Sequence, residues 1–379
     1  MRVREFMSAK LYLLALSVLI SVSFAACSDD DDSRNDNGSK IDLPDSRVFI
    51  LNEGTQGENN AGIAFYDPTN SMKPISDIFS KQNSAKLGDV GQNIIVYNNN
   101  MYVSVVGSNY ITKLNAAGVE QAHQLFSSDK DLSGGIRYLT AKDDYIYASF
   151  WGGVVAKINA KTLAVESKIT KLGNNLEGVT ICNNELYVAN SYKNENNKFI
   201  YLTDVFVIDL SNFKLKKTVT VAQNPNQLVE AGGKVFVVSW DFSSQNGYIV
   251  QEIDPNKDYQ VTKIGYANKI AANGDLLYFI NSLTDWSTNP YVTTNTFRTY
   301  NIKTNTLNAT SFLKNAPEEL SNTSTHMIDI NRDNGDIYIG TTFFSKANGN
   351  IYRFKKDGTF VEKFDCGGQG PSDVVFINY

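Results

Sequence analysis

A short pattern that returns seven times constrains the fold of this chain more than any other feature. In each copy an apolar strand is followed by a polar turn, and an aromatic residue then opens a second strand. The seven aromatic residues are Phe49, Tyr102, Tyr147, Tyr187, Phe236, Tyr278 and Tyr338. A third strand follows, and a weaker fourth strand closes each copy. Repeats of four short strands are typical of the blades of a β-propeller.

The two ends of the chain indicate the number of blades. The first copy lacks an opening strand, and the C-terminal segment 373–377 is an apolar strand without a repeat of its own. That strand would complete the first blade and close the ring, which removes exposed sheet edges. The sequence therefore predicts an all-β fold, a seven-bladed β-propeller over residues 46–379. The recurring aromatic residues are expected in the core, because stacked repeats are stabilised by their neighbours.

The N-terminus predicts the compartment. Basic residues precede an apolar run over residues 11–24, which is short for a membrane span and typical of a signal-peptide core. The small residues before Cys27 resemble the lipobox of bacterial lipoproteins. This resemblance implies a signal peptide over residues 1–26, starting at Met1 or Met7, and a lipid on Cys27 that anchors the chain to a membrane.

The residues after Cys27 are acidic. Ser28 is followed by four consecutive Asp residues, which resembles the surface-export signal of Bacteroidetes lipoproteins. The resemblance implies a lipid-anchored protein exposed on the outer membrane. Residues 27–45 are rich in Asp, Asn, Ser and Gly and contain little that could form a core, so we expect a flexible tether there.

Composition and motifs exclude several classes of function. The net charge is −5 with no basic block, so nucleic acid is not an expected partner. Cys182 and Cys366 lie in different repeats; we expect two buried free thiols, with a disulfide as the alternative. No spacing of Cys and His suits zinc, and no phosphate-binding loop or nucleophile motif is present. The protein is therefore predicted to be no enzyme and to hold no cofactor.

Aromatic residues concentrate on one predicted face. The loop after each second strand lies on the same face as the connections between blades, and all three tryptophans fall in such loops. Clustered exposed aromatic residues mark binding surfaces. The alternative is that they fold back over the blade tops. The predicted aromatic contacts are Phe150, Trp151, Tyr192, Trp240, Phe242, Trp286, Tyr291, Phe343 and Phe344.

A ring of polar residues is predicted at the mouth of the central channel. When the first strands are aligned on their apolar runs, the position at the start of each strand is polar. The seven residues are Gln92, Arg137, Glu177, Asn226, Asn268, His326 and Ser372. Such a ring offers hydrogen bonds to a ligand, although it would equally suit a water-filled channel. Glu53, Asp241 and Asp285 share this face, so glycosidase chemistry stays open.

Residues 46–379 resemble the YncE-like propellers, and more narrowly a domain family of unknown function in Bacteroidetes surface lipoproteins. The repeated Tyr-Val-Ala/Ser strands and the closing segment 370–376 carry this resemblance. Within that family, BtuG proteins capture cobalamin and pass it to a TonB-dependent outer-membrane transporter. The resemblance implies a lipoprotein with cobalamin as ligand and such a transporter as partner. The alternatives are a glycan-binding lipoprotein, a propeller lyase or hydrolase, and a protein-binding scaffold.

Overall fold

The computed structural model describes residues 34–70, 74–285 and 287–379. Residues 35–379 form one compact unit. The predicted signal peptide, Cys27, the acidic residues after it and Trp286 lie outside the described residues. Over the described ranges, no helix has the length and apolar character needed to cross a membrane.

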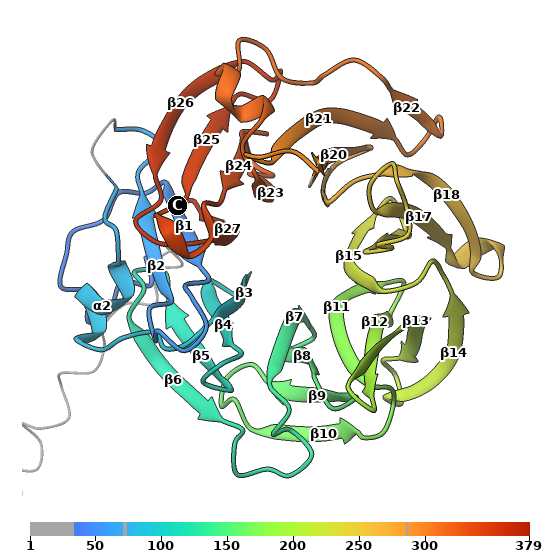
Figure 1. The fold of residues 1–379 in the computed structure, drawn as a ribbon. Coiled ribbons are helices and arrows are strands. Elements are labelled where there is room, and N and C mark those ends of the chain that lie inside the picture. The colour runs from blue at the N-terminus through green and yellow to red at the C-terminus, as the bar shows by residue number, and fades with distance from the viewer. Residues whose placement is uncertain (1–33, 71–73, 286) are drawn as a thin grey trace, which may run out of the picture. The chain divides into compact units, whose positions relative to one another are not determined.

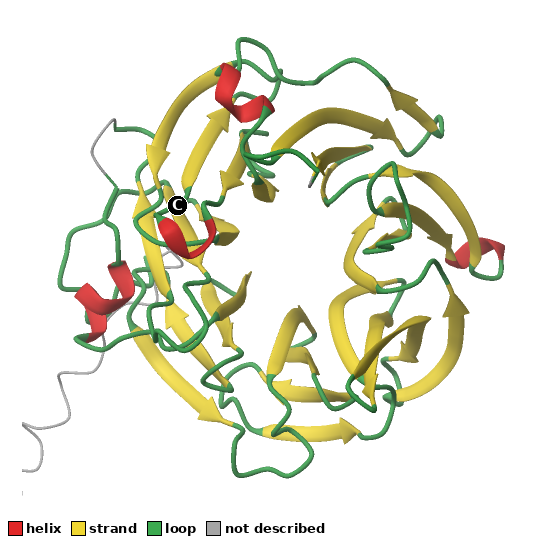
Figure 2. Cartoon of the chain, in the orientation of Figure 1, coloured by secondary structure: helices red, strands yellow, loops and turns green. Residues whose placement is uncertain are grey.

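Seven antiparallel sheets surround a central channel (Figures 1 and 2), as the repeats predict. Six of them contain four strands that are consecutive in the chain. The first three of these six sheets are β3 (Gly91–Tyr97), β4 (Asn100–Val105), β5 (Tyr110–Asn115) and β6 (Glu120–Leu125); β7 (Ile136–Lys142), β8 (Tyr145–Phe150), β9 (Val154–Asn159) and β10 (Val165–Ile169); and β11 (Asn175–Cys182), β12 (Glu185–Glu195), β13 (Lys198–Asp209) and β14 (Lys214–Thr220).

The next three sheets follow in the same order around the ring. They are β15 (Pro225–Ala231), β16 (Lys234–Ser239), β17 (Ile249–Asp254) and β18 (Gln260–Tyr266); β19 (Lys269–Asn273), β20 (Leu276–Asp285), β21 (Val292–Asn301) and β22 (Thr306–Asn308); and β23 (Thr325–Ile330), β24 (Ile337–Thr341), β25 (Asn350–Phe354) and β26 (Phe360–Asp365). Short 3-10 helices occur at Pro255–Lys257, Glu318–Ser321 and Phe344–Lys346. The innermost strand of every sheet lines the channel: it is the first strand of each four-stranded sheet, and the C-terminal strand of the seventh (Figure 1).

The seventh sheet closes the ring with strands from both ends of the unit. β1 (Arg47–Asn52) pairs with β2 (Gly62–Tyr66) on one side and with β27 (Pro371–Ile377) on the other. This confirms the predicted closure by the C-terminal strand. The expected fourth strand is not described; an isolated bridge between Phe65 and Ile75 and the short helix α2 (Ile78–Asn83) follow β2 instead.

The recurring aromatic residues are core residues, as predicted. All seven lie on the second strand of a blade and are at most 5% exposed. Two of the tyrosines place their hydroxyl groups on polar partners: Tyr102 donates to the carbonyl of Ala160 at 2.7 Å, and Tyr187 donates to the Glu185 carboxylate at 2.8 Å. A buried ring with a satisfied hydroxyl stabilises the packing between blades.

The segment before β1 packs against the propeller, so the folded unit begins earlier than the predicted boundary at residue 46. Asp36 accepts two hydrogen bonds from the guanidinium of Arg47, at 2.5 and 2.7 Å, and Leu43 is buried. Arg47 also donates to the carbonyl of Ala116, in the turn after β5. Turns between third and fourth strands lie opposite the loop face, so this segment leaves the channel mouth uncovered.

Cys182 and Cys366 are buried and free, as expected from their places in different repeats. Burial raises the pKa of the Cys182 thiol to about 12 and that of Cys366 to about 11. Both thiols therefore stay protonated at neutral pH and act as small apolar side chains.

Candidate ligand site at the channel mouth

The predicted polar ring coincides with irregularities in the inner strands. In β3, Gly91 pairs with Val105 and Asn93 pairs with Ser104, so Gln92 is the extra residue of a bulge. Equivalent shifts occur in β7, β11, β15, β23 and β27. Bulges redirect side chains and are frequent at the rims of closed sheets and beside binding sites. Six of the seven polar positions are therefore placed by a distortion of the ladder.

The central channel contains a cavity of about 860 Å³ lined by the inner strands of all seven blades. Of the predicted ring, Gln92, Arg137, His326 and Ser372 line this cavity. Glu177 does not line it directly, but it is a buried partner of Arg137.

Two further members of the predicted ring line neither cavity. Asn226 is only 3% exposed and does not line the cavity. Asn268 accepts a hydrogen bond from the backbone of Ser282 at 2.6 Å and therefore tethers β20. Asn268 precedes β19, whose ladder has no bulge that would turn this side chain towards the channel.

Arg137 organises the mouth of the channel. Its guanidinium donates to Glu177 Oε2 through Nε at 2.9 Å and through Nη2 at 2.7 Å, and to the side-chain carbonyl of Gln92. The side chains of Arg137 and Glu177 are 12% and 4% exposed. Burial alone would lower the pKa of Arg137, but the Glu177 carboxylate raises it overall. The Arg137 guanidinium therefore stays charged and is held in place by Glu177.

Trp151 is held on top of this ion pair. Its indole Nε1 donates to Glu177 Oε1 at 3.0 Å, and the Arg137 guanidinium lies 4.4 Å from its ring centroid. A Cβ on Gly134 would lie 2.0 Å from the Trp151 carbonyl oxygen, so only glycine fits there. The half-buried indole is thus fixed by a hydrogen bond, a cation–π contact and a close backbone approach.

A second cavity of about 530 Å³ lies between the loops above Arg137. Trp151 and Phe344 provide its aromatic lining, while Glu53, Arg137 and His326 line both this cavity and the channel. Phe344 is 65% exposed and has a φ of 57°. Positive φ is strained for an aromatic residue, and such strain clusters at ligand sites.

Glu53 and His326 form the polar floor of this mouth cavity. His326 Nε2 and Glu53 Oε2 are 3.1 Å apart, and both side chains are about one-third exposed. Burial alone would raise the pKa of Glu53, but the hydrogen bond and charge of His326, together with Lys269 and Arg137, lower it. Glu53 is therefore a carboxylate at neutral pH.

The predicted aromatic contacts divide into three groups. Trp151 and Phe344 line the mouth cavity, and Trp240 lines the channel cavity. Tyr291 and Phe343 are exposed outside both cavities. Phe150 is fully buried against Phe126, with ring centroids 5.1 Å apart. Its prediction as a ligand contact is wrong, because Phe150 and Trp151 are successive residues at a strand end and point to opposite sides.

A separate group of rings lies over β13 and β16–β17. Phe242 is 57% exposed and contacts Tyr201 and Tyr248, with centroids 5.4 and 5.8 Å apart. Tyr248 also stacks on Trp240. We call Tyr201, Trp240, Phe242 and Tyr248 the ring cluster. Tyr192 contacts exposed Phe199 nearby in the β12–β13 hairpin.

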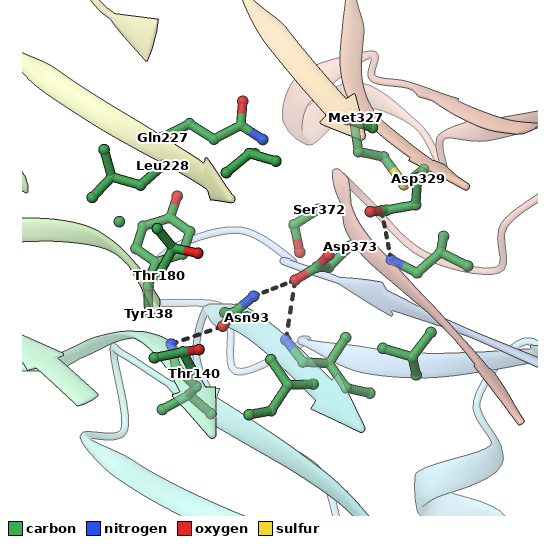
Figure 3. Close-up of a pocket in the computed structure, with 18 of the residues that line it drawn as sticks. Asn93, Tyr138, Thr140, Thr180, Gln227, Leu228, Met327, Asp329, Ser372 and Asp373 are labelled. Carbon is green, nitrogen blue, oxygen red and sulfur yellow. Dashed lines mark hydrogen bonds between the residues drawn. The ribbon is translucent and has the colours of Figure 1, made fainter. Parts of the chain in front are cut away.

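The position after the polar ring was missed by the sequence prediction. There, side chains accept the otherwise unpaired backbone N–H of the next inner strand: Asn93 from Leu139 at 2.9 Å, Gln227 from Ile270 at 3.0 Å, and Asp373 from Ile94 at 3.2 Å. Asp329, which stands three residues after the ring position His326 rather than one, accepts in the same way from Val374 at 3.0 Å (Figure 3). Acidic residues inside apolar strands were the available signal. These contacts satisfy the inner edges of the sheets.

Two of the three loop-face carboxylates have local roles. Asp241 accepts from the backbone of Ser243 at 2.9 Å, and Asp285 accepts from that of Ser287 at 2.9 Å. Neither lines the cavities, so they do not form a carboxylate pair with Glu53 there. Among the described residues no three His, Cys, Asp or Glu side chains are placed to hold a metal ion.

Fold and mouth together define a seven-bladed β-propeller with a cavity on its loop face. Residues 47–204 match the model of a family described as a domain of unknown function, DUF5074. A comparison with curated protein sequences finds no match.

Similar solved structures support the fold. A quinonprotein alcohol dehydrogenase-like protein from Bacteroides thetaiotaomicron has a TM-score of 0.61 at 18% identity, covering 87% of this chain and 77% of that one. Hydrazine synthase from Kuenenia stuttgartiensis has a TM-score of 0.58 at 11% identity, covering 83% and 99%. At these identities the likeness shows the propeller architecture alone.

Proposed function

We propose that this protein is a surface lipoprotein that binds cobalamin at the mouth of its propeller and delivers it to a TonB-dependent outer-membrane transporter. One observation carries the binding proposal: a fixed Trp151 and an exposed Phe344 line a cavity that shares Glu53, Arg137 and His326 with the channel below. Both cavities fall in the range of about 300–1,000 Å³ that is usual for small-molecule sites.

The chemistry of this mouth suits a large amphipathic ligand. Cobalamin has flat apolar surfaces and many carboxamide arms. The apolar surfaces can pack on the two aromatic rings, and the arms can exchange hydrogen bonds with Gln92, Glu53 and His326. The immobilised Trp151 loses little freedom when a ligand arrives, which favours affinity.

Calorimetric titration of the purified protein with cyanocobalamin tests the ligand. We expect one-to-one binding that weakens at least about tenfold in Trp151→Ala, as is usual for an aromatic hot spot. Phe150→Leu serves as the matched control, because the neighbouring ring lies in the core. Absence of heat at high micromolar cyanocobalamin would make the cobalamin proposal wrong.

A second experiment tests the anchor and the partner. Cells fed a clickable palmitate analogue should label the wild-type protein and leave Cys27→Ser unlabelled. Intact cells should expose the labelled protein to added protease, and its capture should retain a TonB-dependent transporter. Labelled protein protected from protease in intact cells would contradict surface exposure.

A further inference from the structure

We propose that the channel below the mouth binds a carboxamide group of the ligand, between the Lys269 ammonium and the Asp329–Asp373 carboxyl pair. This inference deepens the proposed function, because it assigns a subsite to the arm of a ligand that rests on the mouth. The three residues lie on the consecutive inner strands β19, β23 and β27, and all three line the channel cavity.

Lys269 provides a donor without a partner. Its side chain lines the channel, and it makes no hydrogen bond or ion pair with any residue in the described part of the chain. Burial lowers the pKa of Lys269, while the carboxylates of Glu53, Asp373 and Asp329 oppose that effect. A partly desolvated ammonium that lacks an acceptor is costly, so an incoming carbonyl oxygen would be stabilised there.

Asp329 and Asp373 provide the acceptor side. Asp373 Oδ2 accepts from the Ile94 backbone at 3.2 Å and from the Asn93 amide, and Asp329 Oδ2 accepts from the Val374 backbone (Figure 3). Burial raises the pKa of Asp329, and the Asp373 carboxylate raises it further; burial raises the pKa of Asp373 to about 6. Because both pKa values are raised, the pair binds a proton more readily than two exposed carboxylates would, and a protonated member can donate as well as accept.

Charged groups in the upper channel already face partners of opposite charge or hydrogen-bond partners. Arg137 is paired with Glu177, Glu53 contacts His326, and the carboxyl groups of Asp329 and Asp373 act electrostatically on Lys269. A charged ligand group would disturb this arrangement and lose its own hydration. A neutral group with a donor and an acceptor fits better, and the carboxamide is such a group.

The side-chain amides that line the channel already have hydrogen-bond partners in the protein, so a ligand amide does not compete with them for Lys269. Gln227 accepts from the Ile270 backbone at 3.0 Å and donates to its carbonyl at 2.9 Å. Asn93 accepts a hydrogen bond from the Leu139 backbone and donates one to the Asp373 carboxyl group. The protein's own amides thus satisfy strand edges, while Lys269 faces the channel without a hydrogen-bond partner among the described residues.

Saturation-transfer NMR with three small probes tests the subsite independently of cobalamin. We expect millimolar propionamide to give a clear signal with the wild-type protein, and propionate and propylammonium to give at most about one-third of it. The propionamide signal should fall at least threefold in Lys269→Met. Lys363→Met is the control. Lys363 lies on the outer strand β26, away from the channel, and forms an ion pair with Glu319.

The same variants are then titrated with cyanocobalamin, after urea unfolding has shown that they are folded. Lys269→Met should weaken cyanocobalamin binding about tenfold, whereas Lys363→Met should leave it unchanged. If the wild-type protein fails to bind cyanocobalamin, the proposed ligand is wrong and the probe series alone decides the subsite. A propionamide signal that is absent, or equal in wild type and Lys269→Met, would falsify the subsite.

Discussion

The two aromatic sides of the mouth are held in different ways. On one side Trp151 is fixed by the buried Arg137–Glu177 ion pair. On the other side the ring cluster is held by ring contacts, and the indole Nε1 of Trp240 is buried without a hydrogen-bond partner among the described residues. The Trp151 side is therefore pre-organised by polar contacts, whereas the ring cluster is apolar and adaptable.

This difference indicates which side of the mouth should orient a bound ligand and which side should mainly shield it from water. A rigid aromatic ring with a fixed polar neighbour gives orientation and specificity to a bound ligand. An exposed ring such as Phe242, which contacts Tyr201 and Tyr248, contributes area and excludes water, and its loss should cost little. Each prediction below compares a change on the Trp151 side with a matched change in the ring cluster.

The largest effect is expected from removing Arg137. Arg137→Ala leaves the Glu177 carboxylate buried without its partner, which should lower the free energy of unfolding by about 3–5 kcal/mol. Phe242→Ala, at an exposed ring, should lower it by less than about 1 kcal/mol. Urea unfolding followed by fluorescence measures both. Equal losses in the two variants would mean that the two sides are held alike.

The second-largest difference between the two sides is expected in the affinity for the ligand. Trp151→Ala should weaken cyanocobalamin binding by about 2 kcal/mol, or roughly 30-fold, because a pre-organised ring is removed from the cavity wall. Phe242→Ala should weaken it less than about threefold, since Phe242 lines neither cavity. Calorimetric titration gives both values, and the reverse order would place the ligand over the ring cluster.

The two indole N–H groups allow a finer comparison. Trp151→Phe removes a hydrogen bond to a carboxylate and should cost about 1.5 kcal/mol of stability. Trp240→Phe removes a buried N–H that has no partner among the described residues. The stability gained by removing this unpaired group should offset most of the stability lost with the smaller ring. Thermal unfolding at neutral pH measures the difference between them. A larger loss for Trp240→Phe would show that its indole has a partner in solution.

The smallest effect should appear in the pH dependence. The lowered pKa of Glu53 means that its charged form stabilises the fold above its unfolded value of 4.5, and that this contribution is lost as the pH falls through the folded pKa. The difference in unfolding midpoint between wild type and Glu53→Gln should therefore shrink below about pH 4.5. The difference in unfolding midpoint between wild type and Phe242→Ala should not change with pH. If the difference for Glu53→Gln were also independent of pH, the Glu53–His326 contact would be contradicted.

Sequence reasoning predicted the fold better than the site. Strand periodicity with an aromatic residue at a fixed position is a local pattern, and all seven such residues proved to be core residues. The same periodicity could have separated Phe150 from Trp151, since neighbours on a strand face opposite sides. It could not show that Asn268 precedes the one inner strand without a bulge among the described residues.

The segment before β1 shows another limit of composition. Residues 35–45 are polar enough to predict a tether, yet Asp36 pairs with Arg47 and Leu43 is buried. Composition indicates how much core a segment can form by itself, but not whether an existing domain offers it a partner. The charged Arg47 at the start of the otherwise apolar segment 47–51 is a sequence feature that could have pointed to this contact.

The sequence by itself determined the number of blades, the closure by the C-terminal strand and the face on which loops gather. These features follow from alternation and repetition within short stretches of chain. Only the tertiary structure decided that Arg137 meets Glu177 from the next blade, and that Lys269, Asp329 and Asp373 line one cavity. The physical reason is that these partners lie 40 or more residues apart, and bulges and blade packing, which no local pattern encodes, determine which side chains meet.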